Sequence, residues 1–122
     1  MLVLSEAEER FPHISYGNNT LTIEGRSFMD DAVCFYRNIL ARIKSEIPTK
    51  DLLVVFNLEY FNTSSSKCIL EIFRHLLECQ EKGDEIRVEW YYSERSIDMH
   101  EAGEDYKDLA EGLPFDIIEI KG

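Results

Sequence analysis

An almost wholly apolar segment, residues 52–58, runs directly into a series of amide and hydroxyl side chains at residues 62–66. The apolar segment has the length of a β-strand, and its continuous character predicts burial on both faces, as in a central parallel strand. An amphipathic helix pattern follows at once, with apolar residues recurring at helical spacing from Ile69 to Leu77. A buried strand followed by a helix is typical of α/β proteins.

The polar step at residues 62–66 predicts the start of that helix. Asn62 and Thr63 are both good N-cap residues, because their side-chain oxygens accept hydrogen bonds from backbone N–H groups that the first helical turn leaves unpaired. A hydroxyl held there lies at the positive end of the helix dipole, which favours a phosphate group. The step is therefore either a simple capped turn or a phosphorylation switch, and the residues alone favour the capped turn.

Hydrophobic periodicity predicts the elements on both sides of this step. Alternating segments around Gly17-Asn18-Asn19 indicate a β-hairpin. The other expected elements are a helix from near Asp30 to Pro48, a strand at 86–92, a helix capped by Ser93 or Ser96, and a strand at 115–120. The order is β-β-α-β-α-β-α-β. It predicts one α/β domain over residues 1–122, with a mixed sheet of about five strands and the helices packed on its faces.

The net charge of −11 limits the classes of partner. Binding to nucleic acid or to an anionic membrane requires clustered Lys and Arg, which the sequence lacks. The acidic surface favours solubility and could steer a basic protein partner. No apolar run is long enough to cross a bilayer, and the N-terminus lacks the basic start of a signal peptide, so we expect a cytoplasmic protein. Cys34 and Cys68 are expected to be buried free thiols.

The sequence contains no recognisable catalytic, nucleotide-binding or metal-binding motif. Its three histidines, His13, His75 and His100, lie far apart, and acidic residues near His100 are typical of a solvated helix face. The hydroxyls of residues 64–66 are not part of a G-x-S-x-G nucleophile elbow, although a triad could still assemble from distant positions. We therefore predict a protein that is not an enzyme and that uses no metal and no cofactor.

The chain resembles the SiaC-type regulatory phosphoproteins of bacteria, most specifically at Tyr60-Phe61-Asn62-Thr63-Ser64-Ser65-Ser66-Lys67. The resemblance continues through Trp90-Tyr91-Tyr92 and the helix around Gly103 to Pro114-Phe115, and it covers roughly residues 20–120. The element order is also similar to the STAS domains of anti-sigma-factor antagonists. Those domains usually carry an Asp-Ser-Ser step where this chain has Asn62-Thr63-Ser64, which favours the SiaC type.

The resemblance implies a phosphorylation site at Thr63, with Asn62, Ser64 and Ser65 as its immediate recognition surface. It also implies a dedicated serine/threonine kinase, a PP2C-type phosphatase, and a partner that binds the unmodified form. In the best-known system the partner is a diguanylate cyclase, which links the protein to cyclic di-GMP and biofilm control. The alternative implied by the STAS likeness is an anti-sigma-factor antagonist in a partner-switching pathway.

Tyr60 and Phe61, just before the switch, have two interpretations that the sequence leaves open. As large aromatic residues they could anchor a partner, since aromatic side chains are common at interfaces. Equally, they could pack beneath the loop.

Overall fold

The computed structural model describes all 122 residues. Its elements, in chain order, are β1 (Leu2–Ser5), β2 (His13–Gly17), β3 (Thr20–Ser27), α1 (Ala32–Glu46), β4 (Asp51–Phe61), α2 (Thr63–Glu81), β5 (Glu85–Ser93), α3 (Ile97–Leu109) and β6 (Phe115–Ile120). The α/β class and the predicted order from the hairpin onward are confirmed. Of the three helices, none is both long and apolar enough to cross a membrane.

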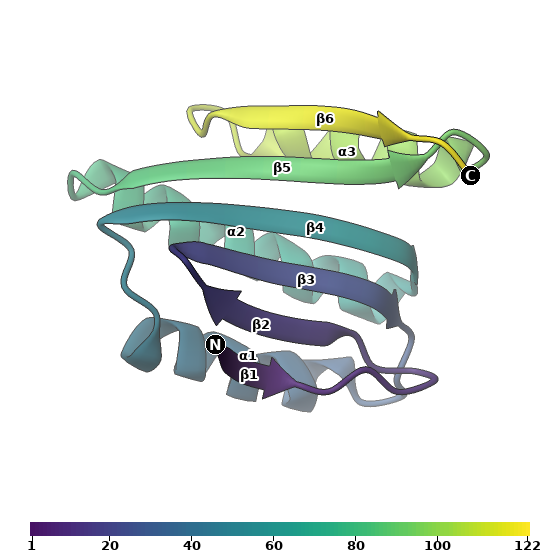
Figure 1. Ribbon diagram of the computed structural model, residues 1–122, viewed down its shortest axis with the longest axis horizontal. Helices are drawn as coiled ribbons and strands as arrows, with labels where there is room; N and C mark the ends of the chain where they lie inside the picture. The colour runs from purple at the N-terminus through teal and green to yellow at the C-terminus, as the bar shows by residue number, and fades with distance from the viewer.

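The strands form one mixed sheet in the order β1-β2-β3-β4-β5-β6 (Figure 1). The pairs β1/β2 and β2/β3 are antiparallel, whereas β3, β4, β5 and β6 pair in parallel. The predicted hairpin turns at Asn18 and Asn19, whose φ angles of 51° and 58° are those of a type I′ turn. Because β3, β4 and β5 all run in the same direction, their carboxyl ends lie at one edge of the sheet, where the polar step begins.

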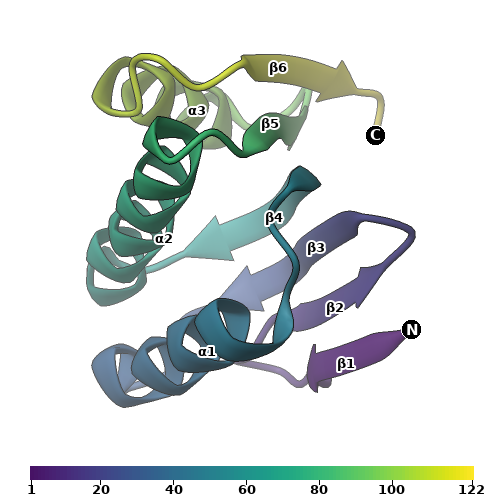
Figure 2. The same cartoon turned by 90° about the vertical axis from the view of Figure 1, so that its left-hand side faces the viewer.

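All three helices cover the same face of the sheet, as Figure 2 shows. Three crossovers connect the parallel strands: β3 to β4 through α1, β4 to β5 through α2, and β5 to β6 through α3. Each advances by one strand in the same direction. Since such crossovers are right-handed, every helix must lie on the same side. The helices therefore pack on the sheet as expected, and they occupy one face of it only. The core lies between this helical layer and the inner face of the sheet, and its largest fully buried side chains include Trp90, Phe56 and Phe73.

The central strand β4 is parallel to both neighbours, as predicted, but it is not buried on both faces. Leu52, Val54, Phe56 and Leu58 are buried, whereas the three side chains between them are only half-buried. The continuous apolar run suggested a second covering layer that the one-sided helix arrangement does not provide. The expectation that Cys34 is buried is also wrong: Cys34 is exposed, because it lies off the buried stripe of α1, which runs through Ala32 and Tyr36.

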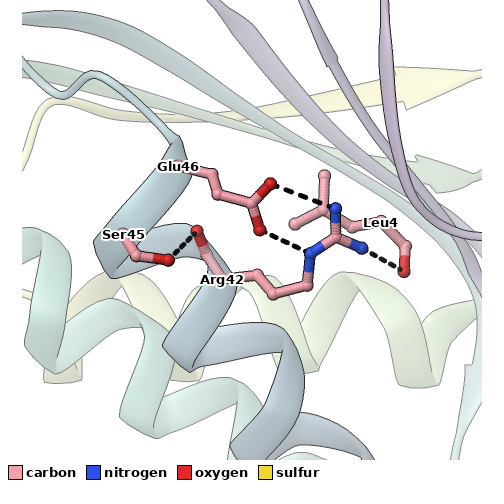
Figure 3. A network of polar contacts seen from close by, with 4 residues as sticks. All are labelled: Leu4, Arg42, Ser45 and Glu46. Atoms are coloured by element: carbon pink, nitrogen blue, oxygen red, sulfur yellow. Dashed lines mark hydrogen bonds and ion pairs between the residues drawn. The ribbon is translucent and has the colours of Figure 1, made fainter.

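The N-terminal strand β1 is an element that the sequence did not predict, and it brings the sheet to six strands. It pairs with β2 through a register shift between Val3 and Ser5. Arg42 of α1 connects β1 to the helical layer (Figure 3): its guanidinium donates to the Leu4 carbonyl at 3.5 Å and forms a two-pronged contact with the Glu46 carboxylate, with distances of 2.6 and 3.3 Å.

Candidate functional site

The polar step forms the capped start of α2, and Asn62 is the residue that builds it. Asn62 is the N-cap, and its Oδ1 accepts a hydrogen bond from the Ser65 N–H at 2.9 Å. Its Nδ2 donates to the Met29 carbonyl at 3.3 Å, and its backbone N–H donates to the Ser27 carbonyl at 3.0 Å. Asn62 therefore fixes the helix start to the β3–α1 connection, with both ends of its amide in use.

Thr63 is the first residue of α2, and its side chain is exposed. No intramolecular hydrogen bond engages its hydroxyl, whereas its carbonyl accepts from the Ser66 hydroxyl at 2.7 Å. The first turn of α2 contains no acidic residue, so nothing within it offsets the positive end of the helix dipole. Thr63 thus presents an accessible hydroxyl where added negative charge is well tolerated.

The three serines that follow Thr63 have different environments. Ser64 is exposed, and Ser66 is half-buried. Ser65 is completely buried, with 0% of its surface accessible. The expectation that Ser65 belongs to the recognition surface is therefore wrong in geometric terms, because position i+2 after an exposed Thr63 points into the protein on the first helical turn.

Ser65 belongs to a buried chain of hydroxyl groups beneath Thr63. The Ser27 hydroxyl donates to Ser65 Oγ at 2.9 Å and lies 2.6 Å from the Tyr36 hydroxyl. Because the Ser27 proton is directed to Ser65, the Tyr36 hydroxyl donates to Ser27. Ser65 in turn donates to the Met29 sulfur at 3.7 Å. This chain joins β3, α1 and α2 directly below Thr63, and no hydroxyl in it is left without a partner.

Burial of this network gives a prediction for the alkaline stability of the protein. Burial raises the pKa of Tyr36 to about 12. The unfolded chain releases the tyrosine proton near pH ~10, whereas the folded protein retains it, so the associated stability is fully present below pH ~10 and is lost as the pH rises to about 12. Replacing Tyr36 by phenylalanine should therefore make the alkaline loss of stability shallower, by a total on the order of 2 kcal/mol.

The measurement is the free energy of unfolding by urea at a series of pH values, for wild type and Y36F. At neutral pH the variant should be less stable by about 1 kcal/mol, because it loses the hydrogen bond to Ser27. Burial also raises the pKa of Tyr106, so a residual alkaline slope should persist in Y36F. Two parallel curves would show that Tyr36 titrates in the folded protein as it does in the unfolded chain.

Tyr60 and Phe61, the two aromatic residues before the polar step, differ in their environments, and each fits one of the two interpretations: an anchor for a partner, or packing beneath the loop. Tyr60 is 53% exposed and packs edge-to-face on Phe28, with 5.9 Å between ring centroids. Phe61 is half-buried and packs against Trp90 and Tyr106. Tyr60 therefore offers surface to a partner, whereas part of Phe61 packs beneath the loop.

Tyr106 of α3 connects a second helix to the start of α2. Its hydroxyl donates to the Ser66 carbonyl at 2.7 Å, and its ring packs against Phe61, Phe73 and Trp90. Tyr106 is buried on the inner side of α3, and no local pattern in the sequence connects it with the polar step. The sequence did not point to Ser27, Met29 or Tyr36 either. Ser27 and Tyr36 carry only the signal of an inward-facing position in β3 and α1, and Met29 lies in the connection between these two elements.

The histidines do not approach the hydroxyls of the polar step by any hydrogen bond. His75 lies on α2 with Nε2 at 3.6 Å from the Cys79 sulfur. His100 stacks on Tyr92 and contacts Glu104 at 3.3 Å. No group of three or more His, Cys, Asp or Glu side chains is arranged to hold a metal ion.

The fold and the site define a class of protein. It is a small α/β protein that presents a free threonine hydroxyl at the start of a central helix, above the buried hydroxyl chain of Ser27, Tyr36 and Ser65. The model of the SiaC family regulatory phosphoproteins matches residues 5–120, and the chain belongs to that family. No curated protein matches the chain.

Solved structures with the same fold come from Pseudomonas aeruginosa. SiaC is 22% identical, with a TM-score of 0.85 over 98% of this chain and 100% of that one. Apo-SiaC is also 22% identical, with a TM-score of 0.83 over 97% and 99%. SiaC in complex with the diguanylate cyclase SiaD, of which it is the activator, is 21% identical, with a TM-score of 0.83 over 93% and 96%.

Proposed function

We propose that this chain is a cytoplasmic regulatory domain without catalytic activity, in which reversible phosphorylation of Thr63 controls binding to a diguanylate cyclase. The observation that supports this most directly is the free, exposed hydroxyl of Thr63 at the start of α2. Family membership adds the regulatory role, and SiaC of Pseudomonas aeruginosa, as the activator of a diguanylate cyclase, suggests the class of partner. A protein kinase would add the phosphate and a PP2C-type phosphatase would remove it. Family membership favours this function over that of an anti-sigma-factor antagonist.

The physical consequence of phosphorylation is a change of surface rather than a change of fold. A phosphate adds about −1.5 to −2 charges and three strong hydrogen-bond acceptors. At the start of α2 this charge meets the positive end of the helix dipole, and Asn62 already satisfies the N–H of Ser65. The helix therefore tolerates the modification. A partner that covers Thr63 does not tolerate it, because binding would have to remove water from the phosphate dianion.

The neighbouring residues take distinct roles in this proposal. Tyr60 and Ser64 are exposed on either side of Thr63 and form the surface that kinase and partner recognise. Phe61 contributes its accessible edge. Asn62 and Ser65 act from below, because their polar atoms are engaged within the protein and hold the first turn in place.

The experiment measures binding of the purified chain to a diguanylate cyclase from the same organism, by isothermal titration calorimetry. Thr63→Val removes the acceptor hydroxyl at nearly constant shape and should bind the cyclase like wild type while resisting the kinase. Thr63→Glu should weaken binding roughly 100-fold, because it places a charge in the contact. Thr63→Gln is the matched uncharged control and should weaken binding much less.

All three variants should unfold within about 0.5 kcal/mol of wild type, as expected for an exposed position. Phosphate incorporation by the kinase, located by mass spectrometry, should fall on Thr63 and disappear in Thr63→Val, while Ser64→Ala remains a substrate. Full cyclase affinity in the phosphorylated protein would refute the switch, even if Glu proved an imperfect mimic.

A further inference from the structure

A shallow groove runs along α3 beside Thr63: it begins between α2 and α3 and continues between α3 and the end of β4. One hollow of about 260 Å³ is lined largely by apolar side chains, among them Phe61, Leu70, Tyr106 and Leu109. A second hollow of about 310 Å³ continues it toward the N-terminal end of α3, and the two share Phe61, Ala102 and Asp105. We call the two together the α2–α3 groove.

The floor of the groove exposes apolar surface that the fold does not need to expose. Leu109 is 60% accessible, and it stands beside the partly buried Leu70 and Ala102. A single exposed leucine is ordinary, but here it borders a hollow lined by other apolar groups. The hollow has room for one large apolar side chain of a partner.

The rim of the groove is acidic. Asp98 and Glu101 line one hollow, and Asp105 lines both. None of these three carboxylates forms an ion pair within the protein, in contrast to Glu104 on the same helix, which contacts His100. The only basic residue among the lining residues of either hollow is Lys67. This local charge matches the net charge of −11 and is complementary to a basic partner.

The groove adjoins Thr63 on two sides. Phe61, two residues before Thr63, lines both hollows. Ser66 and Lys67, three and four residues after it, line the apolar hollow. Because residues three and four apart lie on one face of a helix, Thr63 lies on the same face of α2 as Ser66 and Lys67, at the N-terminal end of that helix.

We propose that the α2–α3 groove is the docking surface for a basic segment of the partner, which places one large apolar side chain between α2 and α3 and flanking Lys or Arg side chains against Asp98, Glu101 and Asp105. This inference rests on the proposed function, because the same partner must respond to Thr63. The segment covers the first turn of α2 when it docks. An apolar part of the segment lies over Thr63, while its Lys or Arg side chains are held by the rim carboxylates. Phosphorylation therefore opposes docking, because the phosphate loses water without gaining a cationic partner, and charge repulsion plays no part.

The experiment measures the affinity of the same cyclase for groove variants with matched controls. Leu109→Ser should weaken binding roughly 10-fold, whereas Val33→Ser, at a comparably exposed apolar residue on α1, should not. The double variant Glu101→Gln/Asp105→Asn should also weaken binding. Asp108→Asn removes a carboxylate from the same helix outside the lining residues and should have little effect.

Salt dependence separates the two ways in which phosphate could act. For a basic segment, raising the salt concentration should weaken binding of the unmodified protein and should not restore binding of Thr63→Glu. Restoration of Thr63→Glu binding by salt would indicate repulsion from an acidic partner and would overturn the inference.

The outcomes also separate this inference from the proposed function. If Thr63→Glu loses affinity while the groove variants bind like their controls, the switch stands and the groove is not the docking surface. If wild type fails to bind the cyclase, both are overturned. Loss of affinity in both sets of variants, with the controls unaffected, supports both.

Discussion

Replacing Gly103 by alanine is expected to destabilise the protein by about 3 kcal/mol, with a fall in melting temperature of roughly 10 °C. A Cβ atom at Gly103 would lie 2.6 Å from Cδ1 and 2.9 Å from Nε1 of Trp90. Helical glycine-to-alanine changes normally stabilise by up to about 1 kcal/mol, so the sign of the effect is itself diagnostic. The absence of a side chain at residue 103 is what allows α3 to approach the sheet this closely.

The Trp90 ring has no room to move away from an added methyl group. It is 1% exposed, and it packs against Phe56, Phe61 and Tyr106. Its indole N–H also donates to the Met99 carbonyl of α3 at 2.9 Å. Retreat of the ring would break that hydrogen bond, whereas retreat of α3 would disturb the contact of Tyr106 with Ser66.

The test is a double-mutant cycle measured by urea unfolding. Trp90→Phe alone removes the hydrogen bond and part of the buried ring and should cost stability. In the Gly103→Ala background the same change should cost at least about 1 kcal/mol less, because the smaller ring relieves the contact. Additive effects, or a Gly103→Ala variant as stable as wild type, would contradict this packing of α3 on Trp90.

Replacing Ser65 by valine is expected to destabilise the protein by about 2–4 kcal/mol. Ser65 is fully buried, and its Oγ lies 2.9 Å from Ser27 Oγ. Valine would add volume at this closely packed position and would leave the Ser27 hydroxyl without its acceptor. Ser65→Ala removes the same acceptor but adds no volume, so it should cost less, about 1–2 kcal/mol.

Thermal unfolding of the two Ser65 variants, with Ser64→Val as the exposed neighbour, tests the contrast between the two positions. Ser64→Val should lie within about 0.5 kcal/mol of wild type. If Ser65→Val were equally harmless, Ser65 would be at the surface, as the sequence suggested, and the buried hydroxyl chain would not exist in solution.

Local patterns in the sequence predicted most of the elements but not the arrangement of the site. The alternating segment around Asn18 and the helical stripes were sufficient for the hairpin and the three helices, because these patterns reflect local periodicity. The four-residue strand β1 was missed, because four residues carry too little periodicity and its pairing depends on distant β2 and on Arg42.

The candidate site was predictable in part for the same reason. Capping is a local interaction, so the sequence placed the helix start at Asn62 or Thr63, and the structure shows Asn62 as the N-cap. Ser65 was misplaced among the surface residues because its burial depends on Ser27 and Tyr36, which lie far away in the chain. Three consecutive serines look alike in sequence, and only the phase of the helix against the sheet distinguishes them.

The sequence by itself determined the α/β class, the strand-to-helix step and Thr63 as the candidate acceptor, because these depend on hydrophobic periodicity, capping and a family resemblance. Only the tertiary structure decided that every helix covers one face of the sheet, that Ser65 is buried beneath Thr63, and that an acid-rimmed groove runs along α3 beside Thr63. Those features arise from contacts between residues distant in the chain, and their geometry follows from the handedness of the crossovers and the close approach of α3 at Gly103.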